Sequence, residues 1–170
     1  PVDCCGRVKL DALKEALCPE TILVSIMYVN NEVGTVQPVE EAASIVKDYN
    51  PSILFHSDAV QGFGKYRIYP KRQKIDLLSV SGHKIHGPKG TGFLYIGEKV
   101  KIRPILFGGG QQRDIRSGTE NVPGIAGLGL AAELAYKDFD IKTALMRELK
   151  EYFISEIGKM ENTVIHGVAD

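Results

Sequence analysis

The chain has 170 residues, 44% of them hydrophobic and 25% charged, so the composition predicts a soluble, globular protein of ordinary domain size. Its 21 basic and 21 acidic residues balance, which gives no argument for a nucleic-acid or membrane-surface partner. No apolar run approaches the ~20 residues that span a bilayer, and the polar first residues do not resemble a signal peptide.

Three cysteines, Cys4, Cys5 and Cys18, are too few and odd in number for a disulfide framework. They indicate free thiols in a reducing compartment. The adjacent pair Cys4 and Cys5 leaves a redox or metal-binding pair as the alternative.

Strand and helix patterns alternate along the sequence. In chain order we expect a helix over about 10–17, a strand over 22–29, a helix over 38–49, strands over 53–56, 77–79 and 92–97, helices over about 123–136 and 141–159, and a short strand over 164–166. This alternation predicts an α/β fold with a mainly parallel sheet flanked by helices. The apolar faces of the last two helices are interpreted as core or as a subunit contact.

Polar residues gather directly after the predicted strands, at 30–34, 58–61 and 81–90, and a glycine-rich polar loop covers 108–121. Open α/β sheets bind ligands beyond the carboxyl ends of their strands. We therefore expect the functional site where these clusters meet.

Lys84 follows a glycine break after an apolar strand, with Ser81 and His83 beside it. A lysine amine condenses with an aldehyde when it is neutral, so this lysine is a candidate for holding an aldehyde cofactor. Taken alone, Lys84 could equally be a solvated surface charge.

Pyridoxal phosphate needs an amine for its aldehyde, a carboxylate at its ring nitrogen and donors for its phosphate. Asp58 ends a predicted strand and is the candidate carboxylate, with a capping role as the alternative. An ion pair at about 3 Å and an effective dielectric of ~20 is worth roughly 5 kcal/mol before desolvation, enough to favour a protonated ring. Gln61 could donate to the ring hydroxyl, and Ser81 and His83 could hold the phosphate.

Four motifs in this order resemble those of cysteine desulfurases: 29–34 (VNNEVG), 56–61 (HSDAVQ), 81–90 (SGHKIHGPKG), and 108–113 with 116–121 (GGGQQR and RSGTEN). The resemblance implies a fold-type I, pyridoxal-phosphate-dependent enzyme of the class V aminotransferase superfamily, usually a homodimer. It implies that residues 1–138 form part of the large, cofactor-binding domain and that 139–170 begin the C-terminal small domain. The chain thus resembles the middle of such an enzyme.

The resemblance also implies a role for each matching residue. Lys84 would be the catalytic Schiff-base lysine. Three residues would contact the cofactor ring: Asp58 at the ring nitrogen, Ala59 on the ring face and Gln61 at the ring hydroxyl. Ser81 and His83 would bind the phosphate, Asn31 would lie by the cofactor and the substrate carboxylate, and Thr119 would contact the phosphate in the partner subunit. Arg116 lies in the same loop as Thr119, and its role is left open between anion contact and scaffolding. His86 stands where relatives often have tyrosine, and we expect little consequence.

The implied activity is removal of sulfur from L-cysteine to give L-alanine and an enzyme persulfide. The persulfide would serve iron–sulfur cluster assembly or tRNA thiolation through a sulfur-acceptor or scaffold protein, in the cytoplasm or an organelle matrix. The family's nucleophilic cysteine lies downstream of the lysine, and Cys4, Cys5 and Cys18 do not match it. Selenocysteine lyase, and a catalytically incompetent piece that binds cofactor or dimerises, are the alternatives.

Other motifs are weaker. His83 and His86 lack a third ligand at a suitable spacing, so no metal site is predicted. The run 87–92 lacks the closing Lys-Ser/Thr of a phosphate-binding P-loop. No direct nucleic-acid contact and no membrane association are expected.

Overall fold

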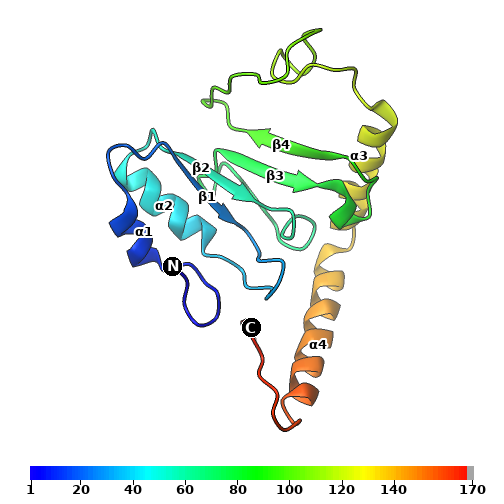
Figure 1. Cartoon of the computed structure of the whole chain (residues 1–170). Helices are drawn as coiled ribbons and strands as arrows, with labels where there is room; N and C mark the ends of the chain where they lie inside the picture. Colours follow the sequence, from blue (N-terminus) through cyan, green and yellow to red (C-terminus); the bar gives the residue numbers. More distant parts are fainter. Residues whose placement is uncertain (168–170) are drawn as a thin grey trace.

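The computed structural model describes residues 1–167, and its centre is a four-stranded sheet with the strand order β1-β2-β3-β4 (Figure 1). The elements are α1 (Leu10–Ala16), β1 (Leu23–Met27), α2 (Val39–Tyr49), β2 (Leu54–Asp58), β3 (Leu77–Ser81), a short 3-10 helix η1 (Gly82–Ile85), β4 (Gly92–Ile96), α3 (Val122–Tyr136) and α4 (Phe139–Ile157). The predicted α/β class is confirmed.

Strands β1, β2 and β3 pair in parallel, whereas β4 runs antiparallel to β3. The connection from η1 to β4 is only a few residues long, and parallel pairing would need a crossover of a dozen or more. Strand β4 must therefore turn back beside β3. The sheet is mainly parallel, as predicted, with one antiparallel edge.

Most predicted boundaries differ from the observed ones by one or two residues, and one predicted strand is wrong. Helix α4 begins at Phe139 rather than at 141, and Pro38 precedes α2 as its cap instead of lying inside it. Residues 164–166 form no strand. A three-residue apolar run becomes a strand only when it pairs with a neighbour, and residues 164–166 pair with none of the four described strands.

One face of the sheet carries the main core. Strands β2 and β3 bury alternate residues, and Phe55 and Ser57 have no exposed surface. Helix α2 packs on β1 and β2 through four buried side chains at helical spacing: Val39, Ala42, Ala43 and Val46. The opposite face of the sheet exposes Leu23, Met27 and Leu94.

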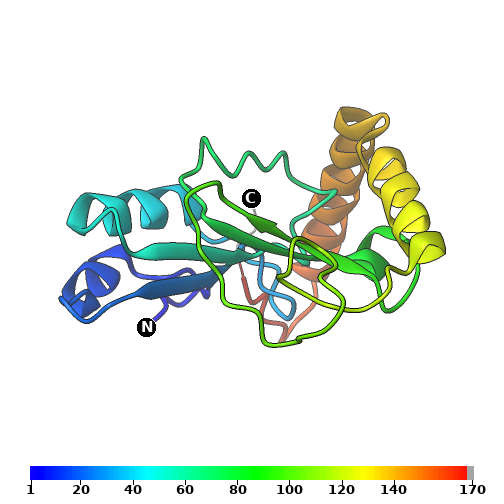
Figure 2. The same ribbon diagram turned by 90° about the horizontal axis from the view of Figure 1, so that it is seen from above.

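A second, smaller cluster fixes η1 to α3. It joins Ile85 to Leu128 and Ala131. Beyond it, α3 and α4 lie at the other end of the sheet from α1 and α2 (Figures 1 and 2). In α4 only Phe139 is buried. Among the residues that the structure describes, no helix combines the length and apolar character needed to cross a membrane.

Candidate active site

Three parallel strands bring the predicted site residues to one edge of the sheet. In the pairing register, Asp58 of β2 lies beside Met27 of β1 and beside Ser79 of β3. Beyond Met27 the chain enters the turn that holds Asn31, and beyond β3 it enters η1, which holds Lys84. Asn31, Asp58 and Lys84 thus follow the carboxyl ends of three neighbouring strands, where ligands bind in open α/β sheets.

Lys84 is positioned by glycines that allow close backbone packing. A Cβ on Gly82 would lie 2.5 Å from Thr91 Oγ1 and 3.0 Å from Leu128 Cδ1, so only glycine lets η1 sit against β4 and α3. The 3-10 turn ends at His86, which has a left-handed backbone with φ of 65°. Sequence alone explains the glycine break but not this packing.

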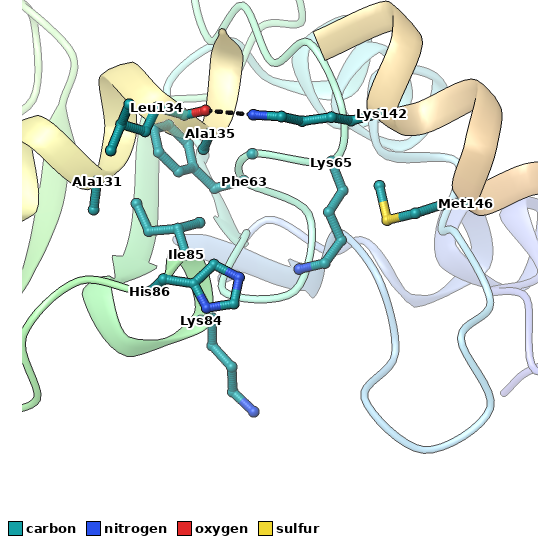
Figure 3. Close-up of a pocket in the computed structure, with 11 residues that line it drawn as sticks. Phe63, Lys65, Lys84, Ile85, His86, Ala131, Leu134, Ala135, Lys142 and Met146 are labelled. Carbon is teal, nitrogen blue, oxygen red and sulfur yellow. Dashed lines mark hydrogen bonds between the residues drawn. The ribbon is translucent and has the colours of Figure 1, made fainter. Parts of the chain in front are cut away.

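The amine of Lys84 is exposed, and it makes no hydrogen bond or ion pair with any residue in the described range 1–167. Figure 3 shows its side chain extending away from the apolar residues beside it. An unpaired, accessible amine at a strand end is chemically suited to react with an aldehyde.

Asp58 is exposed at the end of β2. Its Oδ1 accepts a hydrogen bond from the Val60 N–H at 2.9 Å, so the capping alternative is present for this oxygen. The other carboxylate oxygen has no hydrogen-bond partner within residues 1–167 and can accept one from a ligand. The structure therefore allows both roles at once.

Ser81 and His83, predicted to hold a phosphate, are brought together. Ser81 Oγ lies 2.9 Å from His83 Nδ1. Ala59 is fully buried in the main core, so its predicted contact with a cofactor ring stays a prediction. Gln61 lines a cavity of about 500 Å³ between the 29–34 segment and α4.

Thr119 and Arg116 lie in the exposed loop that joins β4 to α3. The Arg116 guanidinium donates to the Ser117 carbonyl at 2.9 Å, and the Gly118 N–H donates to Gln111 Oε1 at 3.0 Å. These bonds shape the loop itself. Within the described residues they do not join Thr119 or Arg116 to the other predicted site residues.

A cavity of about 460 Å³ lies beside Lys84, lined by residues 63–65, residues 84–86 and side chains of α3 and α4 (Figure 3). It is not lined by Asp58, Ser81 or His83. The cavity therefore lies to one side of Asp58, Ser81 and His83. Together with Lys84 these residues form what we call the strand-end group, which lies at an open edge of the sheet. The carbonyl of Leu134 accepts a hydrogen bond from Lys142 Nζ at 2.8 Å at the rim of this cavity.

Lys65 is a cavity residue that the sequence did not single out. Burial, and after it the nearby charge of Lys84, lowers the pKa of the Lys65 amine. A lysine with a lowered pKa is more often neutral and so competes with Lys84 for an aldehyde. Only its position after the 58–61 cluster could have pointed to it.

His56 was also missed, although it lies in one of the quoted motifs. Its Nδ1 is 2.7 Å from Ser25 Oγ, and its Nε2 is 2.8 Å from Ser79 Oγ, so three strands are linked on the exposed sheet face. Burial lowers the pKa of His56, against the opposing effect of Asp58. The link depends on strand register, which the sequence does not specify.

The group at the strand ends fits pyridoxal phosphate by its chemistry. It offers an unpaired amine, a carboxylate with one open oxygen, and a hydroxyl–imidazole pair. These match the needs of an aldehyde, a ring nitrogen and a phosphate, respectively. No cluster of three or more potential metal-ligating side chains occurs among residues 1–167.

Comparisons with known proteins agree with this chemistry. The family model described as aminotransferase class-V matches residues 1–170. A cysteine desulfurase IscS of Methanosarcina thermophila is 48% identical over 167 residues, which covers 98% of this chain and 41% of the relative. The chain spans about 40% of the length of the curated relatives that it matches.

Solved structures support the same family and fold. A NifS-like protein superposes with a TM-score of 0.92 at 45% identity, covering 98% of this chain and 46% of that one. A structure of SspA in complex with cysteine has a TM-score of 0.74 at 42% identity, covering 78% of this chain and 38% of that one. These matches confirm the family resemblance and the fold type that the motifs implied.

Proposed function

Because the chain belongs to the aminotransferase class-V family, we propose that it forms the pyridoxal-phosphate-binding core of a cysteine desulfurase. One observation carries the proposal: Lys84 and Asp58 follow the ends of adjacent parallel strands, and each has an atom free to bind a ligand. The complex of SspA with cysteine and the desulfurase names of the relatives support L-cysteine as the substrate.

Each residue of the strand-end group has a separate task. Lys84 Nζ would hold the cofactor through its aldehyde and would move a proton to or from Cα of the substrate. The open carboxylate oxygen of Asp58 would hold a proton on the ring nitrogen, and Gln61 would donate to the ring hydroxyl. When bound, pyridoxal phosphate supplies an electron sink for the carbanion at Cα.

Two further groups orient the ligands. Ser81 and His83, already 2.9 Å apart, would hold the phosphate, and Asn31 would contact the substrate carboxylate. Thr119 and Arg116 belong to an exposed loop, which suits a contact to the phosphate in a second subunit and supports a homodimer.

Sulfur transfer also needs a thiolate that attacks the substrate sulfur and keeps it as a persulfide. Cys4, Cys5 and Cys18 do not match the family's nucleophilic cysteine, and the chain spans about 40% of the length of its curated relatives. We therefore assign this thiolate to a part of the protein outside these 170 residues. The persulfide then serves an acceptor such as an iron–sulfur scaffold or a tRNA-thiolating partner, in the cytoplasm or an organelle matrix.

The test is alanine and sulfide release from L-cysteine by the longer protein that contains this chain, loaded with pyridoxal phosphate. Lys84→Ala should lower the rate about 100-fold or more, since one group both holds the cofactor and transfers protons. Lys89→Ala, an exposed lysine on the same loop, is the matched control and should leave the rate unchanged. Release of alanine at an undiminished rate by Lys84→Ala would contradict the proposal.

The same assay with selenocysteine separates the two lyases. A desulfurase should release sulfide from cysteine at a rate comparable with selenide release from selenocysteine. Activity confined to selenocysteine would instead assign a selenocysteine lyase, and inactivity on both substrates would leave a cofactor-binding piece.

A further inference from the structure

Cys4 and Cys5 occupy a tight turn that places both sulfur atoms on the same side. Their Sγ atoms lie 3.9 Å apart and interact with each other. In an extended chain, successive side chains point to opposite sides, so this proximity comes from the turn and not from adjacency in the sequence.

Several hydrogen bonds hold the turn in place. Asp3 Oδ1 accepts from the backbone N–H groups of both Cys5 and Arg7, each at 2.9 Å. Gly6 supplies a positive φ of 80°, a conformation that side-chain-bearing residues rarely adopt. From the other side, the buried Gln37 amide donates to the Gly6 carbonyl at 2.8 Å and accepts from the Val8 N–H at 2.8 Å. The two thiols are therefore presented by a preformed loop.

The pair is accessible, and either sulfur can donate a hydrogen bond to the other. Cys4 is exposed and Cys5 is partly buried, and both are free thiols. The hydrogen bond to Cys4, and then the charge of Cys4, raise the pKa of the Cys5 thiol.

The spacing of the sulfurs suits one soft atom bound between them. Two sulfurs bonded to one atom at about 2.3 Å lie about 3.2–3.8 Å apart for bond angles of about 90–110°, so only a small closing movement from the observed 3.9 Å is needed. Within residues 1–167 no third His, Cys, Asp or Glu completes a metal site around them. A ligand that needs only two protein sulfurs fits better than a metal ion.

We propose that Cys4 and Cys5 form a dithiol site for trivalent arsenicals and electrophiles of the same two-thiol chemistry. An organoarsenic oxide forms two As–S bonds with the two thiols, and its oxygen leaves with both thiol protons as water. Arsenic stays trivalent, so the step needs no oxidant or reductant.

The site is connected to the turn that holds Asn31. The Thr35 hydroxyl donates to the Cys5 carbonyl at 2.5 Å, and the Asn30 N–H donates to the Thr35 carbonyl at 2.9 Å. Thr35 is 1% exposed, so this link has little freedom to relax. An effect of the bound arsenical on substrate binding at Asn31 would rest on the proposed function, whereas arsenical binding itself does not.

The test uses phenylarsine oxide on the folded chain, followed by alkylation with iodoacetamide and peptide mapping. We expect one arsenical per chain, with Cys4 and Cys5 protected and Cys18 alkylated. The adduct should survive an excess of a monothiol and be released by 2,3-dimercaptopropanol, because two bonds must break together.

Three variants and a peptide serve as controls. Cys4→Ser and Cys5→Ser should each lose the monothiol-resistant adduct, whereas Cys18→Ser should keep it. A synthetic peptide of residues 1–9 should bind at least about 10-fold more weakly, since its turn is not preformed. Retention of the adduct in either Cys4→Ser or Cys5→Ser, or equal affinity of the peptide, would overturn the proposal.

Discussion

Helices α2 and α4 lie at opposite ends of the molecule and are held in very different ways. The 11-residue α2 buries four apolar side chains against the sheet, whereas the 19-residue α4 buries only Phe139. Isolated helices are marginally stable, and packing supplies most of their stability in proteins. The sheet and α2 therefore form the stable half that fixes the strand ends, while α4 contributes little to the stability of the chain.

The apolar residues left exposed on α4 include Leu145, Leu149 and Phe153. This face of α4 is therefore exposed within residues 1–167, and its interpretation as core or as a subunit contact stays a prediction. In contrast, α3 buries Leu128 and Ala131 against η1, so it supports Lys84 directly.

The largest expected difference between the two halves comes from two phenylalanines. Phe55 in β2 has no exposed surface, whereas Phe153 in α4 is 63% exposed. Phe55→Ala should lower the free energy of unfolding by about 3–5 kcal/mol through lost burial and a cavity, and Phe153→Ala by less than about 0.5 kcal/mol. Urea denaturation of both variants measures the two losses of unfolding free energy. Equal losses would show that the two halves are equally well packed.

Two aspartates should give a smaller difference in unfolding free energy between the two halves. Asp76 accepts bonds at 2.5 Å from Lys47 Nζ and at 2.7 Å from the Phe55 N–H, and its side chain is 24% exposed. Asp140, at the start of α4, pairs with Arg67 at 2.9 Å but is 81% exposed.

Asp76→Asn should therefore cost about 1.5–3 kcal/mol of unfolding free energy, because charged hydrogen bonds that are shielded from water are lost. Asp140→Asn should cost less than about 1 kcal/mol, as surface ion pairs do. Added salt should reduce the contribution of Asp140 to the unfolding free energy more than that of Asp76. A larger loss at Asp140 would reverse the ranking of the two halves.

The smallest effect is a pH dependence from His56. Burial lowers the folded-state pKa of His56, so the unfolded chain binds the proton more readily. Stability from this residue is thus fully present above the ordinary pKa of about 6.5 and is lost as the pH falls through the folded-state value.

In urea denaturation between pH 8 and 5, His56→Gln should reduce the change of unfolding free energy with pH. At pH 8 it should also lower that free energy by about 1 kcal/mol, because the hydrogen bonds to Ser25 and Ser79 are altered. His166→Gln, an exposed histidine beside α4, is the control and should keep the slope. An unchanged slope in His56→Gln would remove His56 as its source.

The parts that the sequence predicted are those with a local cause. Periodicity located the strands and helices, and the position of Asp58 and Lys84 after apolar strands was enough to place them at one edge once the strands proved parallel. The reversal of β4 was not predicted, although it follows from a short connection. These features depend on residues close together in the chain.

The parts that escaped prediction depend on register and on distant partners. The bonds from His56 to Ser25 and Ser79 exist only because three strands align in one register. The apolar run at 164–166 looked like a strand, but pairing requires a neighbour that the run itself cannot specify. The exposure of α4 likewise depends on what packs against it, which no helical pattern records.

The central claim is that Lys84, at the end of β3, is the amine that holds the aldehyde of pyridoxal phosphate. Borohydride reduction of the cofactor-loaded chain fixes the aldehyde carbon onto the amine that binds it, and peptide mapping then identifies the lysine. We predict a single pyridoxyl group on Lys84, absent from Lys84→Arg and retained in Lys65→Arg. A label on Lys65, whose pKa is lowered by burial, or an even spread over exposed lysines would contradict the account.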